Sequence, residues 1–228
     1  ALDVHGSSVV TCLTAQTPGS FTSLEPATSR FVEDQLDSVL SSLKVKSVKT
    51  GMLYSRSIIE VVAKHLSKFR KCQLVVDPVM ISSTGAPLIK PSAIKALVNS
   101  LLPIAKLVTP NLDEASTLVK QPVRDQEDMR EAARHIYAQF GCAVLVKGGH
   151  LKTSEAIDLF YDGKEELLLS APRSKRISPP GTGCTYSSAI TGYLAKGEPL
   201  VSAVVLAKQY ITKSFENVYR AGKYNFLG

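Results

Sequence analysis

The feature that most constrains the fold is an alternation of short, almost wholly apolar runs with longer helical patterns. Strand-like runs at 45–50, 73–76 and 106–108 are each followed by residues with helical spacing, and a further apolar run lies at 143–146. Strands that are apolar on both faces and joined by helices favour a parallel sheet covered on both sides. The sequence therefore predicts an α/β fold.

The remaining elements fit around this sheet. A strand is expected at Ser8–Leu13, and a hairpin from Ala156–Tyr161 and Glu165–Ser170, turning at Asp162-Gly163. We expect helices over 28–43, 55–69, 91–101, 111–119, 125–140, 182–194 and 200–219. With no linker or repeat in its 228 residues, the chain is interpreted as one domain, 1–228.

Composition narrows the classes of function. The chain is 44% hydrophobic, but no apolar run has the length of a membrane span, so no membrane partner is expected. Its net charge of +7 comes from dispersed Lys and Arg with few aromatics, which argues against a nucleic-acid interface and suits either a solvated basic surface or an anionic small substrate. The four cysteines have no paired metal spacing, so we expect reduced thiols and a cytoplasmic protein.

A glycine-flanked turn, Gly181-Thr182-Gly183-Cys184, opens the predicted helix at 182–194. The first backbone N–H groups of a helix are unpaired and point with its dipole, so they form an anion site. A thiol there could have a lowered pKa and lie beside a reacting phosphoryl group. Taken alone, the four residues are interpreted equally well as a tightly packed helix entry.

Other polar residues follow the predicted strands, at the sheet edge where ligands of open α/β folds bind. Gln16 is a candidate partner for a heterocycle edge, and Lys147 a cation for a transferring phosphate. Asn111 and Glu114 are candidates for holding hydrated Mg²⁺, or form only a capping box. Lys147 could equally be a solvated strand end.

In order and spacing, these segments resemble the hydroxymethylpyrimidine/phosphomethylpyrimidine kinases of thiamine biosynthesis, which have the ribokinase-like fold. The similarity covers nearly the whole chain, and a Cys in the glycine turn separates these kinases and related pyridoxal kinases from sugar kinases. The segments that carry it are Ala15-Gln16, Lys49-Thr50-Gly51-Met52-Leu53, Val76-Asp77-Pro78-Val79-Met80, Thr109-Pro110-Asn111-Leu112-Asp113-Glu114-Ala115, Val146-Lys147-Gly148-Gly149-His150 and Gly181-Thr182-Gly183-Cys184-Thr185.

The resemblance implies a three-layer α/β/α kinase that uses ATP and Mg²⁺ to phosphorylate 4-amino-5-hydroxymethyl-2-methylpyrimidine and then its monophosphate. It implies that Gln16, Val79 and Met80 contact the pyrimidine, although Met80 is more often a core residue. Lys147 and the backbone of Gly181, Thr182 and Gly183 would hold ATP phosphates, with Asn111 and Glu114 near Mg²⁺ through water. Cys184 would lie beside the attacking oxygen as a base or positioning group, and a homodimer is possible.

The sequence departs from the family pattern at three places. The family's first strand–loop–helix unit is not seen before Ala1, so we expect an N-terminally incomplete chain, or one part of a longer fusion protein. Pro179-Pro180 replaces a polar approach to the glycine turn, and the C-terminal residues lack the usual ending. The alternatives to the pyrimidine kinase are a pyridoxal kinase of the same fold and a non-catalytic paralogue that binds the pyrimidine or a nucleotide.

Overall fold

The chain folds around a six-stranded sheet with strand order β3-β4-β5-β6-β7-β8. The structure is a computed structural model, and it describes residues 1–228 except 70, 82–86, 150, 152 and 174–178. Strands β3 to β6 are parallel, and β7 and β8 pair antiparallel at one edge. The strands of this sheet are β3 (Ser47–Thr50), β4 (Gln73–Val76), β5 (Leu107–Val108), β6 (Ala143–Lys147), β7 (Glu155–Tyr161) and β8 (Glu166–Pro172).

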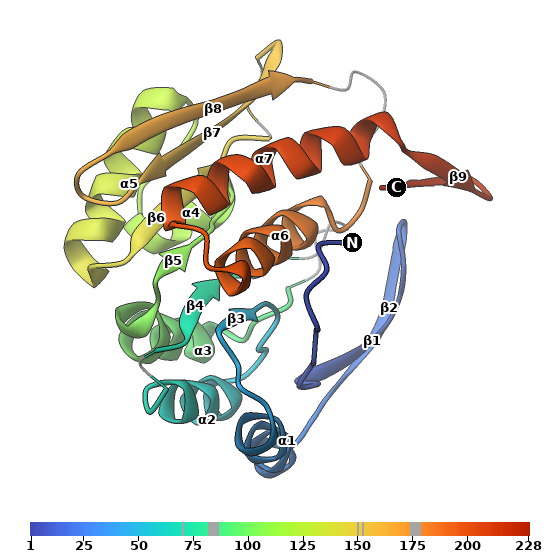
Figure 1. The fold of residues 1–228 in the computed structure, drawn as a ribbon, viewed down its shortest axis with the longest axis vertical. Coiled ribbons are helices and arrows are strands. Elements are labelled where there is room, and N and C mark those ends of the chain that lie inside the picture. The colour runs from blue at the N-terminus through green and yellow to red at the C-terminus, as the bar shows by residue number, and fades with distance from the viewer. Residues whose placement is uncertain (70, 82–86, 150, 152, 174–178) are drawn as a thin grey trace.

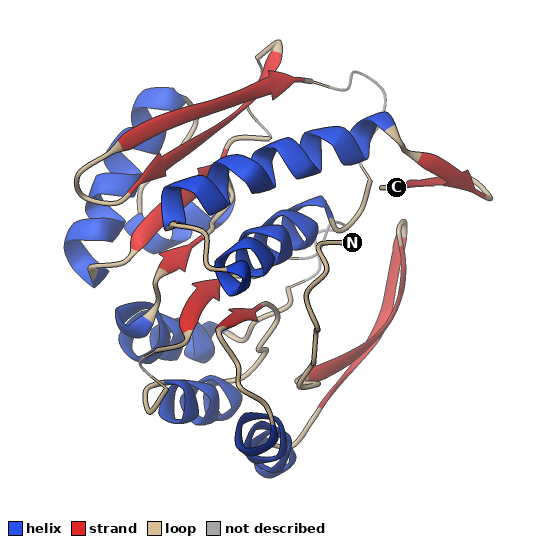
Figure 2. Cartoon of the chain, in the orientation of Figure 1, coloured by secondary structure: helices blue, strands red, loops and turns tan. Residues whose placement is uncertain are grey.

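Helices cover both faces of the sheet, as Figures 1 and 2 show. Neighbouring strand residues point to opposite sides, so Val76 packs into one core with α1 to α5 while Val75 packs into the other with α6 and α7. This confirms the predicted three-layer α/β/α architecture. The helices are α1 (Ser29–Ser42), α2 (Arg56–Leu66), α3 (Pro91–Ala96), α4 (Leu112–Val119), α5 (Gln126–Phe140), α6 (Thr182–Lys196) and α7 (Leu200–Glu216).

Local signals explain why the helices begin where they do. The side chains of Thr28, Ser55 and Asp125 accept hydrogen bonds from the first turns of α1, α2 and α5. Pro91 opens α3, and this helix continues as a π-helical turn at Leu97–Leu101 and a 3₁₀ turn at Leu102–Ile104. No helix in the described part of the chain is long and apolar enough to cross a membrane.

The expected strand at Ser8–Leu13 is wrong. The backbone N–H and C=O of Val10 bond the side-chain amide of Gln35 on α1, at 2.9 and 3.0 Å, instead of a neighbouring strand. The first strand of the structure is β1 (Cys12–Thr17), which forms a separate antiparallel hairpin with β2 (Ser20–Pro26).

A second small hairpin follows α7. It consists of β9 (Tyr219–Ala221) and β10 (Tyr224–Phe226), so the helix predicted over 200–219 ends earlier, at Glu216. A Cβ atom at Gly19, in the turn of the β1–β2 hairpin, would lie 3.2 Å from the hydroxyl of Tyr224. The two hairpins therefore touch, beside the sheet (Figure 1).

Candidate active site

The carboxyl ends of β4, β5 and β6 bring several predicted site residues together. Asp77 follows β4, Asn111 follows β5, and Lys147 is the last residue of β6. The backbone N–H of Lys147 donates to Pro110 O at 2.8 Å, and Lys147 and Asn111 form a parallel bridge. The parallel register therefore sets these two residues next to each other.

Asn111 and Glu114 form the predicted capping box at the start of α4. The Asn111 side chain accepts from the Glu114 N–H, and the Glu114 carboxylate accepts from the Asn111 N–H, both at 2.8 Å. Glu114 is only 5% exposed. Burial raises the pKa of its carboxyl to about 7, against the lowering effect of Lys147 and of the Asn111 N–H. A nearby cation would stabilise the ionised form of this desolvated carboxylate.

Asp77 is the centre of the site, a role that the sequence analysis missed. Its Oδ1 lies 2.9 Å from Lys147 Nζ and accepts from Thr109 Oγ1 at 3.3 Å, while its Oδ2 accepts from Ser187 Oγ at 2.9 Å. Lys49 Nζ approaches Oδ2 at 3.8 Å. The four partners come from β3, β6, α6 and the end of β5. An aspartate directly after a wholly apolar strand is the signal that could have indicated this role.

The predicted anion cradle corresponds to the N-terminus of α6. Gly181 precedes the helix at φ 82°, a left-handed conformation that favours glycine, and it offers no side-chain capping group. The Thr185 N–H bonds Gly181 O at 2.8 Å, so the N–H groups of Thr182, Gly183 and Cys184 precede the first bonded turn. The Thr182 hydroxyl donates to Pro179 O at 2.8 Å. Thr182 therefore contributes its backbone N–H, and not its side chain, to the cradle.

Lys147 lies against this cradle. A Cβ atom on Gly183 would be 3.2 Å from Lys147 Nζ, so the missing side chain makes room for the ammonium group. Burial alone would lower the pKa of Lys147, but the charges of Asp77 and Glu114 outweigh it and raise the pKa. Lys147 therefore stays protonated beside a row of helix-end N–H groups.

Cys184 differs from the expectation of a lowered thiol pKa. The residue is exposed at the cradle, yet protein around the sulfur and then the charge of Asp77 raise its pKa above the ordinary value. Lys49 and Lys147 act in the opposite direction and are outweighed. The thiol is thus protonated at neutral pH, chiefly because the surrounding protein desolvates the thiolate, and in part because the Asp77 carboxylate repels it.

The three predicted pyrimidine contacts lie in different surroundings. Met80 is 4% exposed and belongs to the core. Val79 is half-buried beside it. Gln16 is exposed within β1, next to an irregularity of the hairpin, rather than at an exit of the central sheet. Hydrogen bonds and ion pairs of the described residues do not connect Gln16 to the cluster around Asp77. His150 lies outside the described residues.

A buried ion pair supports the loop after Lys147. Asp158 of β7 pairs with Lys147 across the sheet and accepts from the Gly148 N–H at 3.0 Å. Lys208 of α7 donates to Asp158 Oδ2 at 2.8 Å and to Ala156 O at 2.9 Å. Asp158 and Lys208 are 5% and 8% exposed, so each charge relies on the other.

The strand ends offer a small set of oxygen donors that could bind Mg²⁺. Among the described residues, no group of three or more His, Cys, Asp or Glu side chains could hold a metal. Asp77 already bonds three partners, which leaves the buried Glu114 and the Asn111 amide as oxygen donors. Mg²⁺ commonly binds one or two carboxylates, with water and substrate phosphates completing its shell. The residues present fit such a site.

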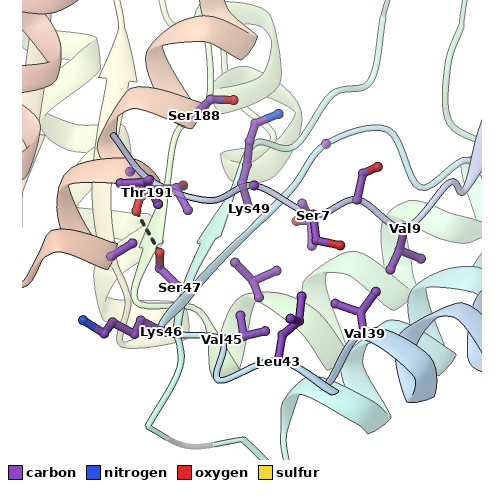
Figure 3. A pocket seen from close by; sticks show the side chains of 18 of the residues that line it. Ser7, Val9, Val39, Leu43, Val45, Lys46, Ser47, Lys49, Ser188 and Thr191 are labelled. Carbon is purple, nitrogen blue, oxygen red and sulfur yellow. Dashed lines mark hydrogen bonds between the residues drawn. The ribbon is translucent and has the colours of Figure 1, made fainter. Parts of the chain in front are cut away.

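A cavity of about 1150 Å³ runs along the outer edge of β3. Figure 3 shows Lys46 and Lys49 among the lining side chains, with Ser188 of α6 close to Lys49. Its wall includes Thr50, whose buried hydroxyl has no hydrogen-bond partner in the described part of the chain. The cavity therefore adjoins the Asp77 cluster at Lys49.

Comparison with known proteins assigns the family. The model of the phosphomethylpyrimidine kinase family matches residues 1–227. A hydroxymethylpyrimidine/phosphomethylpyrimidine kinase of Rhizobium meliloti is 45% identical over 92% of this chain and 79% of its own. A thiamine biosynthesis bifunctional protein of Geobacter sulfurreducens is 42% identical over 97% of this chain, which spans 45% of that protein's length.

Comparison with solved structures leads to the same family. A phosphomethylpyrimidine kinase of Clostridium difficile superposes with a TM-score of 0.82 at 34% identity, covering 94% of this chain and 88% of that one. A pyridoxal kinase of Staphylococcus aureus in complex with ADP gives 0.90 at 29% identity, covering 100% and 83%. With a cradle, a lysine and a capped carboxylate at the strand ends of a three-layer fold, this chain belongs to the phosphomethylpyrimidine kinase family.

Proposed function

We propose that this chain transfers the γ-phosphoryl group of ATP to the hydroxymethyl group of 4-amino-5-hydroxymethyl-2-methylpyrimidine, and then to the monophosphate so formed. The relatives named above carry this activity in their names. The observation that carries the proposal is the position of Lys147 Nζ against Gly183, at the N-terminus of α6. A cation and helix-end N–H groups aimed at one point suit a phosphoryl group in transfer.

In this proposal, Lys147 and the backbone of Gly181, Thr182 and Gly183 bind the ATP phosphates. Glu114 and Asn111 hold Mg²⁺ through water, and the metal supplies charge neutralisation when bound. Pro180 donates no N–H, but the donors that precede the first bonded turn of α6 come after it.

Cys184 acts in this proposal as a positioning group. Its raised pKa keeps the thiol protonated, so it can donate a weak hydrogen bond but is poorly suited to take the proton of the attacking hydroxyl. Phosphoryl transfer proceeds through a loose transition state that needs little help from a base. As the new O–P bond forms, the bond between the γ-phosphorus and the bridging oxygen breaks and ADP leaves, and the proton of the acceptor hydroxyl passes to solvent.

An ADP-release assay with the pyrimidine alcohol tests the function. Lys147→Gln keeps a donor toward Asp77 but removes the positive charge, so we expect kcat per folded molecule to fall by at least about a hundredfold, and Tm to fall as well because the buried Asp77 loses its counter-charge. Glu114→Gln should raise the Mg²⁺ concentration needed for half-maximal rate. No turnover and no stabilisation by the alcohol or ATP would sink the proposal.

Pyridoxal is the second candidate acceptor. It is favoured by the superposition with pyridoxal kinases of Staphylococcus aureus at TM-scores of 0.89 to 0.90. Since the phosphate end is shared, only the pocket discriminates the two acceptors. Comparing kcat/KM for pyridoxal and for the pyrimidine alcohol under the same conditions decides between them.

A further inference from the structure

Two lysines lie on either side of Asp77, and only one of them is engaged. Lys147 Nζ bonds Asp77 Oδ1 at 2.9 Å and lies against the cradle. Lys49 Nζ approaches Oδ2 at 3.8 Å, beyond hydrogen-bond distance, and makes no hydrogen bond of its own within the described residues. Its side chain is 19% exposed, so its three N–H donors remain available to a ligand.

The strand order places the two lysines on opposite sides of the transfer position. Lys147 ends β6, beside Asn111 and Glu114, on the side proposed above for the nucleotide. Lys49 belongs to β3 at the sheet edge, where it lines the cavity of about 1150 Å³. Figure 3 shows its ammonium group near Ser188 of α6. Lys49 is therefore the cation on the cavity side of Asp77, away from the side proposed for the nucleotide.

The two successive acceptors differ chiefly in charge. The alcohol is neutral, whereas a phosphate monoester carries nearly two negative charges at pH 7. The same cleft already holds the carboxyl groups of Asp77 and Glu114, which are 2% and 5% exposed and repel a second anion. Lys147 faces the nucleotide, so the monophosphate needs a cation from the cavity side.

We propose that Lys49 determines acceptor specificity by binding the phosphate group of the monophosphate, so that the second phosphorylation depends on it more strongly than the first. This assignment rests on the function proposed above. Lys49 would touch the acceptor's existing phosphate, not the group in transfer. The ordinary salt bridge alternative, in which Lys49 only balances Asp77, predicts equal effects on both steps.

The test compares Lys49→Met with wild type on each acceptor separately, the alcohol and its chemically prepared monophosphate. We expect kcat/KM for the monophosphate to fall by about ten- to a hundredfold, the loss typical of one charge-assisted hydrogen bond. The value for the alcohol should fall less, by about tenfold or more, than the value for the monophosphate, so the monophosphate accumulates when the alcohol is the substrate. Lys49→Arg, which keeps the charge, should retain more of the second step.

Lys46→Met is the matched control. Lys46 is exposed and lines the same cavity, three residues before Lys49 and just before β3 begins, roughly 10 Å away. It should leave the ratio of the two steps unchanged. Raising the ionic strength should slow the second step more than the first in wild type, and this difference should shrink in Lys49→Met.

The outcomes separate the two proposals. A wild type active on both acceptors, with Lys49→Met losing both equally or neither, would overturn the assignment of Lys49 and leave the function standing. A wild type inactive on both acceptors would overturn the function and this assignment with it. Activity on the alcohol serves as an internal measure of folding, and Lys49→Gln replaces Lys49→Met if the latter does not fold.

Discussion

The buried pair between Lys208 and Asp158 gives the sharpest prediction of stability. Lys208→Met keeps the length of the side chain but removes the ammonium group 2.8 Å from Asp158 Oδ2. Because Asp158 is only 5% exposed, its carboxylate would be left buried without a counter-charge. Breaking such a pair costs about 3–5 kcal/mol. For a chain of 228 residues, 1 kcal/mol corresponds to roughly 2–4 °C, so Tm should fall by about 6–20 °C.

The double variant Lys208→Met/Asp158→Asn distinguishes this reasoning from a general loss of packing. The side-chain amide introduced at position 158 is neutral, and its oxygen could still accept the Gly148 N–H. The double variant should therefore be more stable than Lys208→Met alone. Urea denaturation at constant m-value measures the coupling in a double-mutant cycle. Effects that add within about 0.5 kcal/mol would refute the coupling.

The pH dependence of Lys208→Met has a definite sign. Burial raises the pKa of Asp158 in the folded protein, and the charge of Lys208 opposes this shift. Without Lys208 the folded-state pKa rises further, so folding favours the protonated acid. That penalty is absent below the unfolded pKa of about 3.9 and grows as pH rises toward the folded value. The stability deficit of Lys208→Met should thus be smaller at pH 5 than at pH 8, and a deficit independent of pH would contradict the assignment.

Three further predictions concern the cradle and one turn. Gly183→Ala places a Cβ 3.2 Å from Lys147 Nζ, so kcat/KM for ATP should fall at least about tenfold while Tm holds or rises, because Ala favours the helix; unchanged kinetics would contradict the cradle. The raised pKa of Cys184 predicts slow alkylation by iodoacetamide at pH 7 that accelerates with pH, followed by peptide mass spectrometry; rapid alkylation at pH 7 would show a lowered pKa. Gly163 has a φ of 92°, and a Cβ added there would clash with the ring of Tyr137. Gly163→Ala should therefore lower the free energy of unfolding by about 1–3 kcal/mol and leave turnover per folded molecule unchanged.

The sequence predicted best what local patterns determine. The strand at Gln73–Val76 and the starts of α2 and α5 follow from apolar runs and capping residues, and all were found. The capping box of Asn111 and Glu114 was predicted from its spacing alone. These features depend on residues within one turn or one strand, so no knowledge of distant contacts is required.

What the sequence could not predict depends on contacts between distant segments. Val10 looks like part of a strand, but a glutamine 25 residues later takes both of its backbone groups. Asp77 accepts a hydrogen bond from the hydroxyl of Ser187, which lies 110 residues later in the chain, and no local sequence pattern predicts this contact. The raised pKa of Cys184 follows in part from that same aspartate, so the expected thiolate character failed for a reason visible only in three dimensions.

The arrangement around Asp77 has a consequence for how such kinases could diversify. One carboxylate ties the end of the nucleotide-side strand to the helix that carries the cradle, through Lys147 and Ser187. Changes along the β3 cavity that spare Lys49, which both lines the cavity and approaches Asp77, leave these two contacts in place. An engineer who wishes to change the acceptor should accordingly vary the wall of the cavity and leave Asp77 and its partners intact.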